Sequence, residues 1–282
     1  MKKKLITLLL IISGGIIHGQ TWLHDMDQAK ALAKAQQRFI LVDFYADWCG
    51  PCKEMDANTW SKPEVVRQLD KLVIAKIDID FNKALAARFG VKAIPHVFIV
   101  DPLGNCVHDI EGYQSAYSMA QLLQNFPEDV KPVVAALQKL EANPEDPMLM
   151  LGVAAAYQNC TKPLDAKGRG IFLRAGDSYL KQAKRSFKKA EKEAGLERVE
   201  LLDCCGRLLQ DKAKKVIKTL EKMGAENVHP ENKALACYIA SMGYLELEDA
   251  ENAKIFAAKL QQQEDGDNYI NELQATYPEF EW

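Results

Sequence analysis

The sequence has no second Cys-x2-Cys pair, no strong excess of one charge and no long apolar run beyond its first residues. A structural zinc site takes four ligands from Cys, His or carboxylates, and the adjacent pair Cys204–Cys205 has the wrong spacing for such a site. The formal net charge of −3 provides no broad basic field, which argues against nucleic acid as a partner. We therefore expect no metal, no cofactor and no nucleic acid.

An apolar run at the N-terminus indicates export. Three lysines at positions 2–4 precede the apolar segment Leu5–Ile17, and small Gly19 follows it. This order is typical of a signal peptide, and it predicts cleavage after residue 19. The run is short for a transmembrane helix, which needs about 20 residues, so an uncleaved anchor is the alternative. No Cys follows the run, so a lipoprotein signal is not indicated. We expect a periplasmic or extracellular mature protein.

The chain contains seven cysteines, an odd number. Outside the cytoplasm thiols tend to be oxidised, so any suitably placed pair is a disulfide candidate. An odd count leaves at least one thiol unpaired or paired with another molecule. We interpret Cys204 and Cys205 as small apolar residues of a buried helix, with a vicinal disulfide or redox relay as the alternative.

Residues 20–128 alternate between strand and helix patterns. Continuous or alternating apolar runs predict strands, namely Phe39–Tyr45, Leu72–Ile79, His96–Val100 and Cys106–Ile110. Helical spacing predicts helices between them, namely Asp25–Gln37, Cys52–Leu69, Asn82–Phe89 and Ser118–Phe126. This order predicts an α/β domain, with a central mixed sheet flanked by helices on both faces.

Residues 129–282 lose the β-branched runs and become rich in Ala, Leu, Lys, Glu and Gln, which predicts an all-α domain. The expected helices are Asp129–Ala142, Pro147–Asn159, Asp177–Ala194, Glu197–Met223, Asn232–Leu247 and Ala250–Gln263. We expect breaks at Asn143-Pro144, Thr161–Gly170 and Gly224–Pro230. Similar apolar triplets recur at offsets of 30 and 40 residues, near the period of tetratricopeptide repeats. Ordinary amphipathic periodicity in an irregular bundle is the alternative.

The segment Cys49-Gly50-Pro51-Cys52 follows the first predicted strand and opens a predicted helix. A thiol at a helix N-terminus is stabilised as the thiolate, which is the nucleophile in disulfide exchange. Cys52 lies one turn later, where it can resolve a mixed disulfide. Gly50 keeps the turn open, and Pro51 suits the first helical turn because it lacks an N–H. A metal clip lacks its remaining ligands, and a purely structural disulfide would close too small a loop to stabilise the chain much.

The segment "VDFYADWCGPCK" resembles the active-site segment of thioredoxin, and the similarity continues through "KIDIDFNKALAARFGVKAIPHVFIV" to "GNCVHDIEGY". It covers about residues 22–126, and it implies a thioredoxin fold. The stretch "KEMDANTW" lacks the helix-kinking proline of thioredoxin itself. It resembles secreted thioredoxin-like proteins and the soluble reducing domain of bacterial thiol:disulfide interchange proteins instead.

The resemblance implies a role for each matched residue. It makes Cys49 and Cys52 the redox-active disulfide, Asp43 the buried proton-transfer carboxylate and Lys76 the lysine partner of Asp43. It also implies that Ile94-Pro95 faces the dithiol through a cis bond. The implied substrate-contacting residues are Trp48, Gly50, Pro51, Ile94 and Pro95.

The sequence therefore predicts an exported thiol–disulfide oxidoreductase with protein disulfide substrates. Gly-Pro between the cysteines, with Ile before the distant proline, resembles the reducing members. This suggests a reductase supplied by a membrane electron donor. The alternatives are an oxidase or isomerase of the same fold, or a scaffold whose helical domain binds a client.

Overall fold

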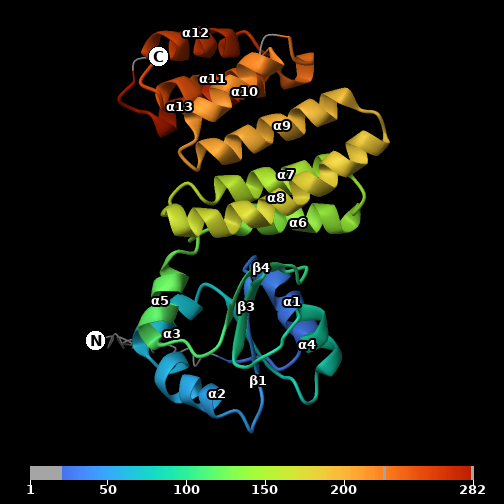
Figure 1. The fold of residues 1–282 in the computed structure, drawn as a ribbon, viewed down its shortest axis with the longest axis vertical. Coiled ribbons are helices and arrows are strands. Elements are labelled where there is room, and N and C mark those ends of the chain that lie inside the picture. The colour runs from blue at the N-terminus through green and yellow to red at the C-terminus, as the bar shows by residue number, and fades with distance from the viewer. Residues whose placement is uncertain (1–20, 225–226, 281–282) are drawn as a thin grey trace, which may run out of the picture.

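The structure is a computed structural model that describes residues 21–224 and 227–280 (Figure 1). The predicted signal segment Leu5–Ile17 and its cleavage point lie outside the described residues. A sheet-containing half is followed by a half made of helices, and the chain passes between them after α5 (Ala116–Gln124) and before α6 (Lys131–Ala142). The predicted fold class, a mixed sheet with helices followed by helices alone, is confirmed. The boundary between residues 128 and 129 stays a prediction.

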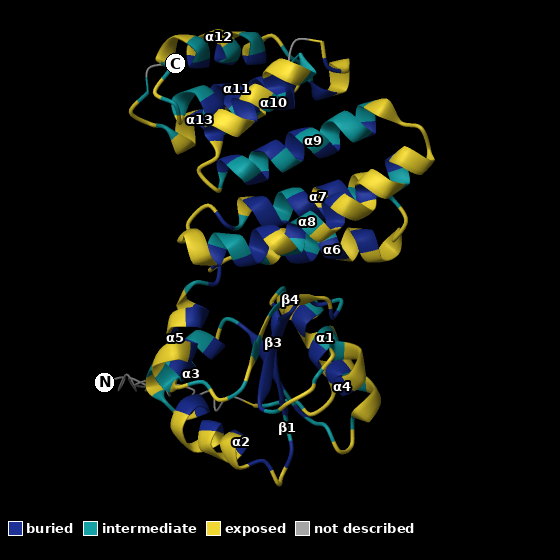
Figure 2. Cartoon of the chain, in the orientation of Figure 1, coloured by how far each residue is buried: buried dark blue, intermediate teal, exposed yellow. Residues whose placement is uncertain are grey.

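The sheet has the strand order β2-β1-β3-β4. Its strands are β1 (Ile40–Tyr45), β2 (Val73–Asp78), β3 (His96–Val100) and β4 (Cys106–Glu111). β1 is parallel to β2, and β3 is antiparallel to both β1 and β4. In this register Asp43 of β1 lies between Lys76 of β2 and Val97 of β3. The near-continuous apolar sequence of β1 fits its position, because the strand is covered on both faces (Figure 2).

Helices cover both faces of the sheet. One face packs against buried residues of α1 (Met26–Gln36) and α4 (Lys83–Phe89). The other face packs against α2 (Gly50–Met55), the following π-helical turn Asp56–Trp60, α3 (Pro63–Leu69) and α5. The predicted helix Cys52–Leu69 is therefore wrong as one element. Pro63 has no N–H to continue the ladder and restricts the residue before it, so a new helix begins there.

The helical half contains helices α6 to α13, each packed against the next. After α6 these are α7 (Pro147–Asn159), α8 (Ala166–Lys189), α9 (Glu193–Leu208), α10 (Ala213–Met223), α11 (Lys233–Leu245), α12 (Ala250–Gln261) and α13 (Gly266–Thr276), with a 3-10 turn at Pro230–Asn232. Helices α7, α9, α11 and α13 also contact one another in that order. The odd-numbered helices from α7 onward therefore form a continuous row.

Three expectations for this half are wrong. We expected a break over Thr161–Gly170 and a helix start at Asp177, but α8 already begins at Ala166. The side chain of Asp165 caps this helix by accepting a hydrogen bond from the amide of Gly168. Gly168 packs closely against the backbone of Asn125, because a Cβ at this position would lie only 2.7 Å from the Asn125 carbonyl oxygen. The expected helix Glu197–Met223 is two helices, separated by a turn in which Asp211 adopts a left-handed conformation that Asp tolerates. Helix α13 had not been predicted.

The two halves share one hydrophobic core. Phe39, which precedes β1, contacts the rings of Tyr157 and Phe172 with centroids 6.2 and 6.0 Å apart. At the β3–β4 turn, the hydroxyl of Tyr179 donates to buried Asp101 at 3.2 Å. The helical half therefore completes the core of the sheet-containing half at the amino end of β1.

Candidate functional site: the Cys49–Cys52 disulfide

The disulfide between Cys49 and Cys52 lies at the start of α2, and α2 lies at the end of the sheet remote from the helical half (Figure 1). β1 begins at Ile40, directly after Phe39 at the junction with the helical half, and leads from Tyr45 into the loop before Cys49. The loops at this end of the sheet leave the disulfide without cover from α6–α13. A partner chain therefore reaches it without contacting the helical half.

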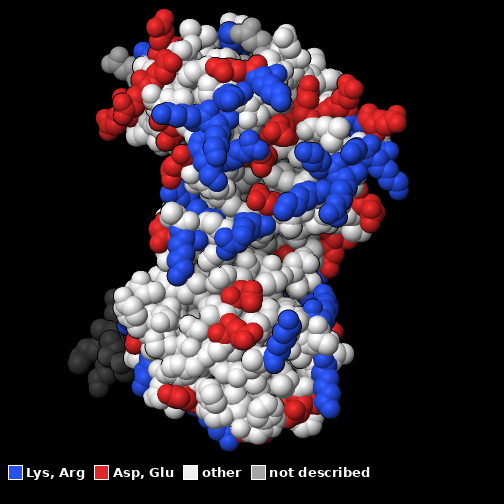
Figure 3. All heavy atoms as spheres, viewed as in Figure 1, with Lys and Arg blue, Asp and Glu red and all other residues white. Residues whose placement is uncertain are grey.

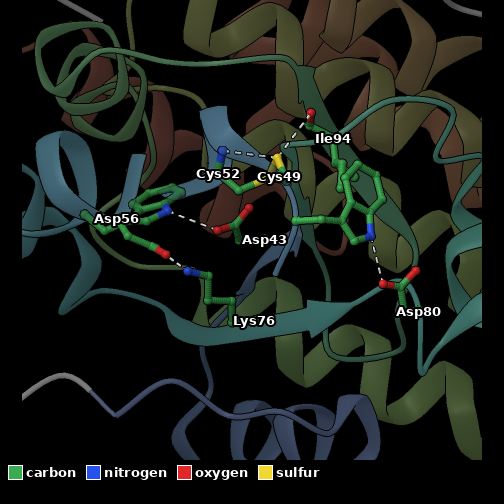
Figure 4. Close-up of a disulfide and its surroundings, with 9 residues drawn as sticks. Asp43, Cys49, Cys52, Asp56, Lys76, Asp80 and Ile94 are labelled. Carbon is green, nitrogen blue, oxygen red and sulfur yellow. Dashed lines mark hydrogen bonds and ion pairs between the residues drawn. A yellow bond between two sulfur atoms is a disulfide. The ribbon is translucent and has the colours of Figure 1, made fainter. Parts of the chain in front are cut away.

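Cys49 caps the first turn of α2. The amide of Cys52 donates to the sulfur of Cys49 at 3.1 Å, and Pro51 occupies the first helical turn (Figure 4). Free N–H groups at a helix start stabilise a negative charge, so this position favours the thiolate of Cys49 after reduction. Cys49 exposes 3% of its surface and Cys52 2%, so both cysteines are almost fully buried.

Ile94 and Pro95 lie beside Cys49, and the bond between them is cis, as the resemblance implies. The Ile94 carbonyl oxygen lies 3.7 Å from the sulfur of Cys49. The amide of Gly112 donates to the Pro95 carbonyl at 2.8 Å, which ties this loop to the end of β4. Pairing of β3 with β1 begins at His96, so Ile94 lies outside the sheet ladder.

Asp43 lies beneath the disulfide and is 1% exposed. The indole N–H of Trp60 donates to one carboxylate oxygen at 3.0 Å, while the other oxygen has no hydrogen-bond partner within the described residues. Burial raises the pKa of Asp43 to about 6. The charge of Lys76 and the Trp60 hydrogen bond lower that pKa, and the charge of Asp56 raises it. The carboxyl can therefore gain or lose a proton near neutral pH.

Residues 21–125 match the thioredoxin family model. This part of the chain is a thioredoxin domain. Three curated relatives, all named thiol:disulfide interchange protein DsbD, align with about a third of the chain. The protein from Cronobacter sakazakii is 36% identical over 107 residues, which are 36% of this chain and 18% of the relative. The protein from Yersinia pestis is 35% identical over 102 residues (34% and 17%), and that from Vibrio vulnificus 32% over 108 residues (36% and 18%). The chain thus spans less than a fifth of the length of these relatives.

Two solved structures align with the same fraction of the chain. The oxidised C-terminal domain of DsbD from Neisseria meningitidis is 29% identical, with a TM-score of 0.33. Its alignment covers 37% of this chain and 97% of that one. A thioredoxin from Thermus thermophilus is 26% identical, with a TM-score of 0.35, and its alignment covers 37% and 85%.

Lys76 does not contact Asp43 directly in the thioredoxin domain. Its ammonium group forms an ion pair with Asp56, and it lies 4.8 Å from the ring centroid of Tyr45. The lysine therefore acts on Asp43 through its charge alone, while the direct contact is made by Trp60.

The sequence did not identify three residues of the site, namely Asp56, Trp60 and Asp80. The indole N–H of Trp48 donates to Asp80 at 2.9 Å, which holds this 66%-exposed ring beside the disulfide. The π-helical turn after Met55 directs Trp60 toward Asp43, and no sequence pattern predicts such a turn. One signal was present for Trp60, because a buried Trp needs a partner for its N–H and Asp43 was already expected to be buried.

The cysteines outside the disulfide differ from Cys49 in their surroundings. Burial raises the pKa of Cys106 to about 11 and those of Cys160, Cys204 and Cys205 to about 12, so these thiols stay protonated near neutral pH. Cys204 and Cys205 lie on α9 without a bond between them, as free thiols. Among residues 21–224 and 227–280, no cluster of His, Cys, Asp and Glu could hold a metal ion. No helix within those same ranges is both long and apolar enough to span a membrane.

Proposed function

We propose that this chain is an exported protein thiol–disulfide oxidoreductase that works as a reductase. The observation that carries the proposal is a disulfide at a helix start, directly above a buried carboxyl whose pKa is about 6. A nucleophilic sulfur and a nearby group that exchanges a proton near neutral pH are the two components that disulfide exchange requires.

The proposed reaction begins with the reduced protein. The Cys49 thiolate attacks one sulfur of a client disulfide, forms a mixed disulfide and releases one client thiolate. Cys52 then attacks the sulfur of Cys49, forms the intramolecular disulfide and releases the second client thiolate. The client takes up two electrons from the dithiol, and its two thiolates take up protons. An external donor then returns two electrons to Cys49–Cys52.

Asp43 is the proposed proton carrier for Cys52. The Cys52 thiol must lose a proton before it attacks, and a carboxylate with a pKa of about 6 is ionised at pH 7 and can accept it. We assign Lys76 an indirect role, since its charge favours the ionised form of Asp43 while its ammonium group remains paired with Asp56.

The proposed client contacts surround Cys49. A Cβ built at Gly50 meets no atom within 4 Å, so a client backbone can approach there. Ile94 lies outside the sheet ladder and offers its backbone to an extended client segment, with Pro95 holding the loop in place. Trp48, which directly precedes Cys49, provides an exposed ring held by Asp80, and Pro51 follows Cys49 in the first turn of α2.

The direction of electron flow is tested by equilibrium with glutathione. We expect a reduction potential near the value of about −270 mV typical of thioredoxin, with a membrane electron donor keeping the dithiol reduced. A potential above about −200 mV would contradict a reductase and favour the oxidase or isomerase alternative. Cys106→Ser, which removes a thiol outside the site, is the matched control and should leave the potential unchanged.

Clients are tested by trapping. A Cys52→Ser protein should retain clients as mixed disulfides on Cys49, because the resolving thiol is absent. The double variant Cys49→Ser/Cys52→Ser should retain none. Equal retention by both variants would show that another cysteine forms the adducts and would contradict the assignment of Cys49. Export is tested separately, by whether the N-terminus of the protein isolated from cells begins at Gln20.

A second candidate function is client binding by the helical half. A cavity of about 140 Å³ is bordered by residues of α7, α9, α11 and α13, the continuous row of helices, and its wall includes the rings of Tyr238 and Tyr269, which contact each other in a tilted arrangement. Concave inner rows are the usual binding surfaces of helical repeat proteins. A Tyr269→Ala variant should then leave insulin reduction unchanged while reducing the set of clients trapped by Cys52→Ser. An unchanged client set would contradict this role.

A further inference from the structure

The net charge of the chain conceals a strong separation of charge within the helical half. Residues 166–222 contain 16 Lys and Arg against 8 Asp and Glu, whereas residues 223–282 contain 3 against 12. Figure 3 shows Lys and Arg gathered over the helical half on the face that it presents, while the sheet-containing half carries few charges on that face. The basic residues are therefore concentrated on one part of the surface.

Three consecutive helices bring these residues together. The basic face consists of exposed lysines on α8 and α10, on either side of α9, namely Lys181, Lys184, Lys188, Lys215, Lys218 and Lys222. On each helix they follow one another at intervals of three or four residues, so each set forms a single stripe.

Two observations relate both stripes to α9. Lys215, Lys218 and Lys222 line a surface hollow of about 540 Å³ together with Glu200 of α9. Burial raises the pKa of Asp177 on α8. Asp203 of α9 raises it further, and the charges of Lys181 on α8 and of Lys212, directly before α10, lower it, so the charges of all three segments act on this carboxyl. Two carboxylates of α9, those of Glu200 and Asp203, form ion pairs with Arg207 of the same helix.

The lysines of the basic face form no close ion pair with the part of the chain that the structure describes. Within residues 21–224 and 227–280, none of the six forms an ion pair within 4 Å. Lysines elsewhere do form such pairs, for example Lys34 with Glu141 and Lys71 with Glu128, both at 2.5 Å. The positive charge of the face is therefore available to an external anion.

We propose that the basic face binds an anionic membrane surface through phospholipid headgroups. Opposite charge alone would suit an acidic protein as well, but the composition of the face favours lipid. Protein interfaces have a core enriched in aromatic residues, Met and Arg, and depleted in Lys. The basic face is made of lysines, and none of the exposed large apolar side chains of the described residues lies on α8, α9 or α10. A polybasic surface binds anionic lipid without such an apolar core.

This membrane contact does not depend on the proposed redox function. The disulfide lies at the far end of the other half, so a chain bound through α8 and α10 leaves Cys49 uncovered. Binding can therefore be measured with the oxidised protein and no client.

The test is co-sedimentation with vesicles, using the chain from Gln20 onward so that the apolar segment Leu5–Ile17 cannot insert. We expect binding to phosphatidylglycerol–phosphatidylcholine vesicles at low salt, and none to phosphatidylcholine alone. At about 0.5 M salt binding should be lost, because charges are then screened over less than about 5 Å. Each lysine near an anionic surface contributes about fivefold to the partition coefficient. The triple variant Lys215→Gln/Lys218→Gln/Lys222→Gln should thus weaken binding about 100-fold.

The matched control removes the same charge elsewhere. Lys83, Lys131 and Lys139 are exposed lysines of α4 and α6, and their triple Gln variant should bind as the unchanged protein does. A second variant, Lys181→Gln/Lys184→Gln/Lys188→Gln, tests the α8 stripe independently and should weaken binding to a similar extent. Equal loss in the control, equal binding to neutral vesicles, or no binding to either vesicle would overturn the proposal.

Discussion

Asp43 destabilises the folded protein when it is ionised, and Asp43→Asn should remove that effect. The carboxyl has a pKa of about 6 in the folded protein and 3.8 as its ordinary value, with burial as the main cause. Below pH 3.8 the group is protonated in both the folded and the unfolded chain, so it has no effect on stability. Above pH 6 it is ionised in both, and the folded state then carries the full penalty of the buried charge.

The magnitude follows from the difference between the two pKa values. About two pH units at 1.36 kcal/mol each give a loss of about 3 kcal/mol in the free energy of unfolding as the pH rises from below 3.8 to above 6. Asn has the same shape and no charge. Its amide can leave an unpaired donor where the unpartnered oxygen of Asp43 now lies, but that cost does not change with pH.

Urea unfolding of the oxidised protein at pH 3.5 and pH 7.5 measures this effect. The free energy of unfolding of Asp43→Asn minus that of the unchanged protein should increase by about 3 kcal/mol between the two pH values. Asp70→Asn, the same change at an exposed residue, should give a difference that is the same at both. A difference for Asp43→Asn that is constant or decreases with pH would refute the electrostatic account of the site.

Three further predictions concern the site and the junction between the halves. Trp60→Phe removes the hydrogen bond to the Asp43 carboxylate, worth about 1.5–3 kcal/mol, and should move the pH midpoint of disulfide exchange upward by roughly one to two pH units. An unchanged pH–rate profile would contradict the role of Asp43 in proton transfer. Phe172→Ala opens a cavity against Phe39 and Phe126 and should lower the free energy of unfolding by about 3–5 kcal/mol in one cooperative transition. Separate unfolding of the two halves would contradict a shared core. Tyr179→Phe loses the hydroxyl that donates to Asp101 and should cost about 1–2 kcal/mol in urea unfolding, whereas Tyr117→Phe at an exposed ring should cost nothing measurable.

The sequence predicted those features that depend on local pattern. Strand His96–Val100 and helix Pro147–Asn159 match the structure to the residue, because an apolar run and a segment with Asp at its cap and Pro in its first turn are local signals. The dithiol was recognisable for a similar reason, since its two cysteines and the intervening turn lie within four residues.

The wrong or missing predictions have a different cause. They depend on contacts between residues that are far apart in the sequence. Glycine has a low helix propensity, but Gly168 lies inside α8 because the carbonyl of Asn125 leaves no room for a Cβ there. Phe39 looked like the ordinary first residue of a strand, yet it contacts side chains more than 100 residues away. The basic face was invisible in the net charge, because the acidic residues after position 222 cancel it.

The position of the disulfide restricts how the helical half can assist reduction. β1 spans the distance between the Phe39 junction and the loop before Cys49, and six residues of strand extend about 20 Å. A client held in the cavity among α7, α9, α11 and α13 must therefore extend past at least this length before its disulfide contacts Cys49. Because the shared core joins the two halves, bending of the chain cannot readily shorten this path. Recruitment through the cavity thus favours clients with a flexible segment of more than about six residues between the bound region and the disulfide.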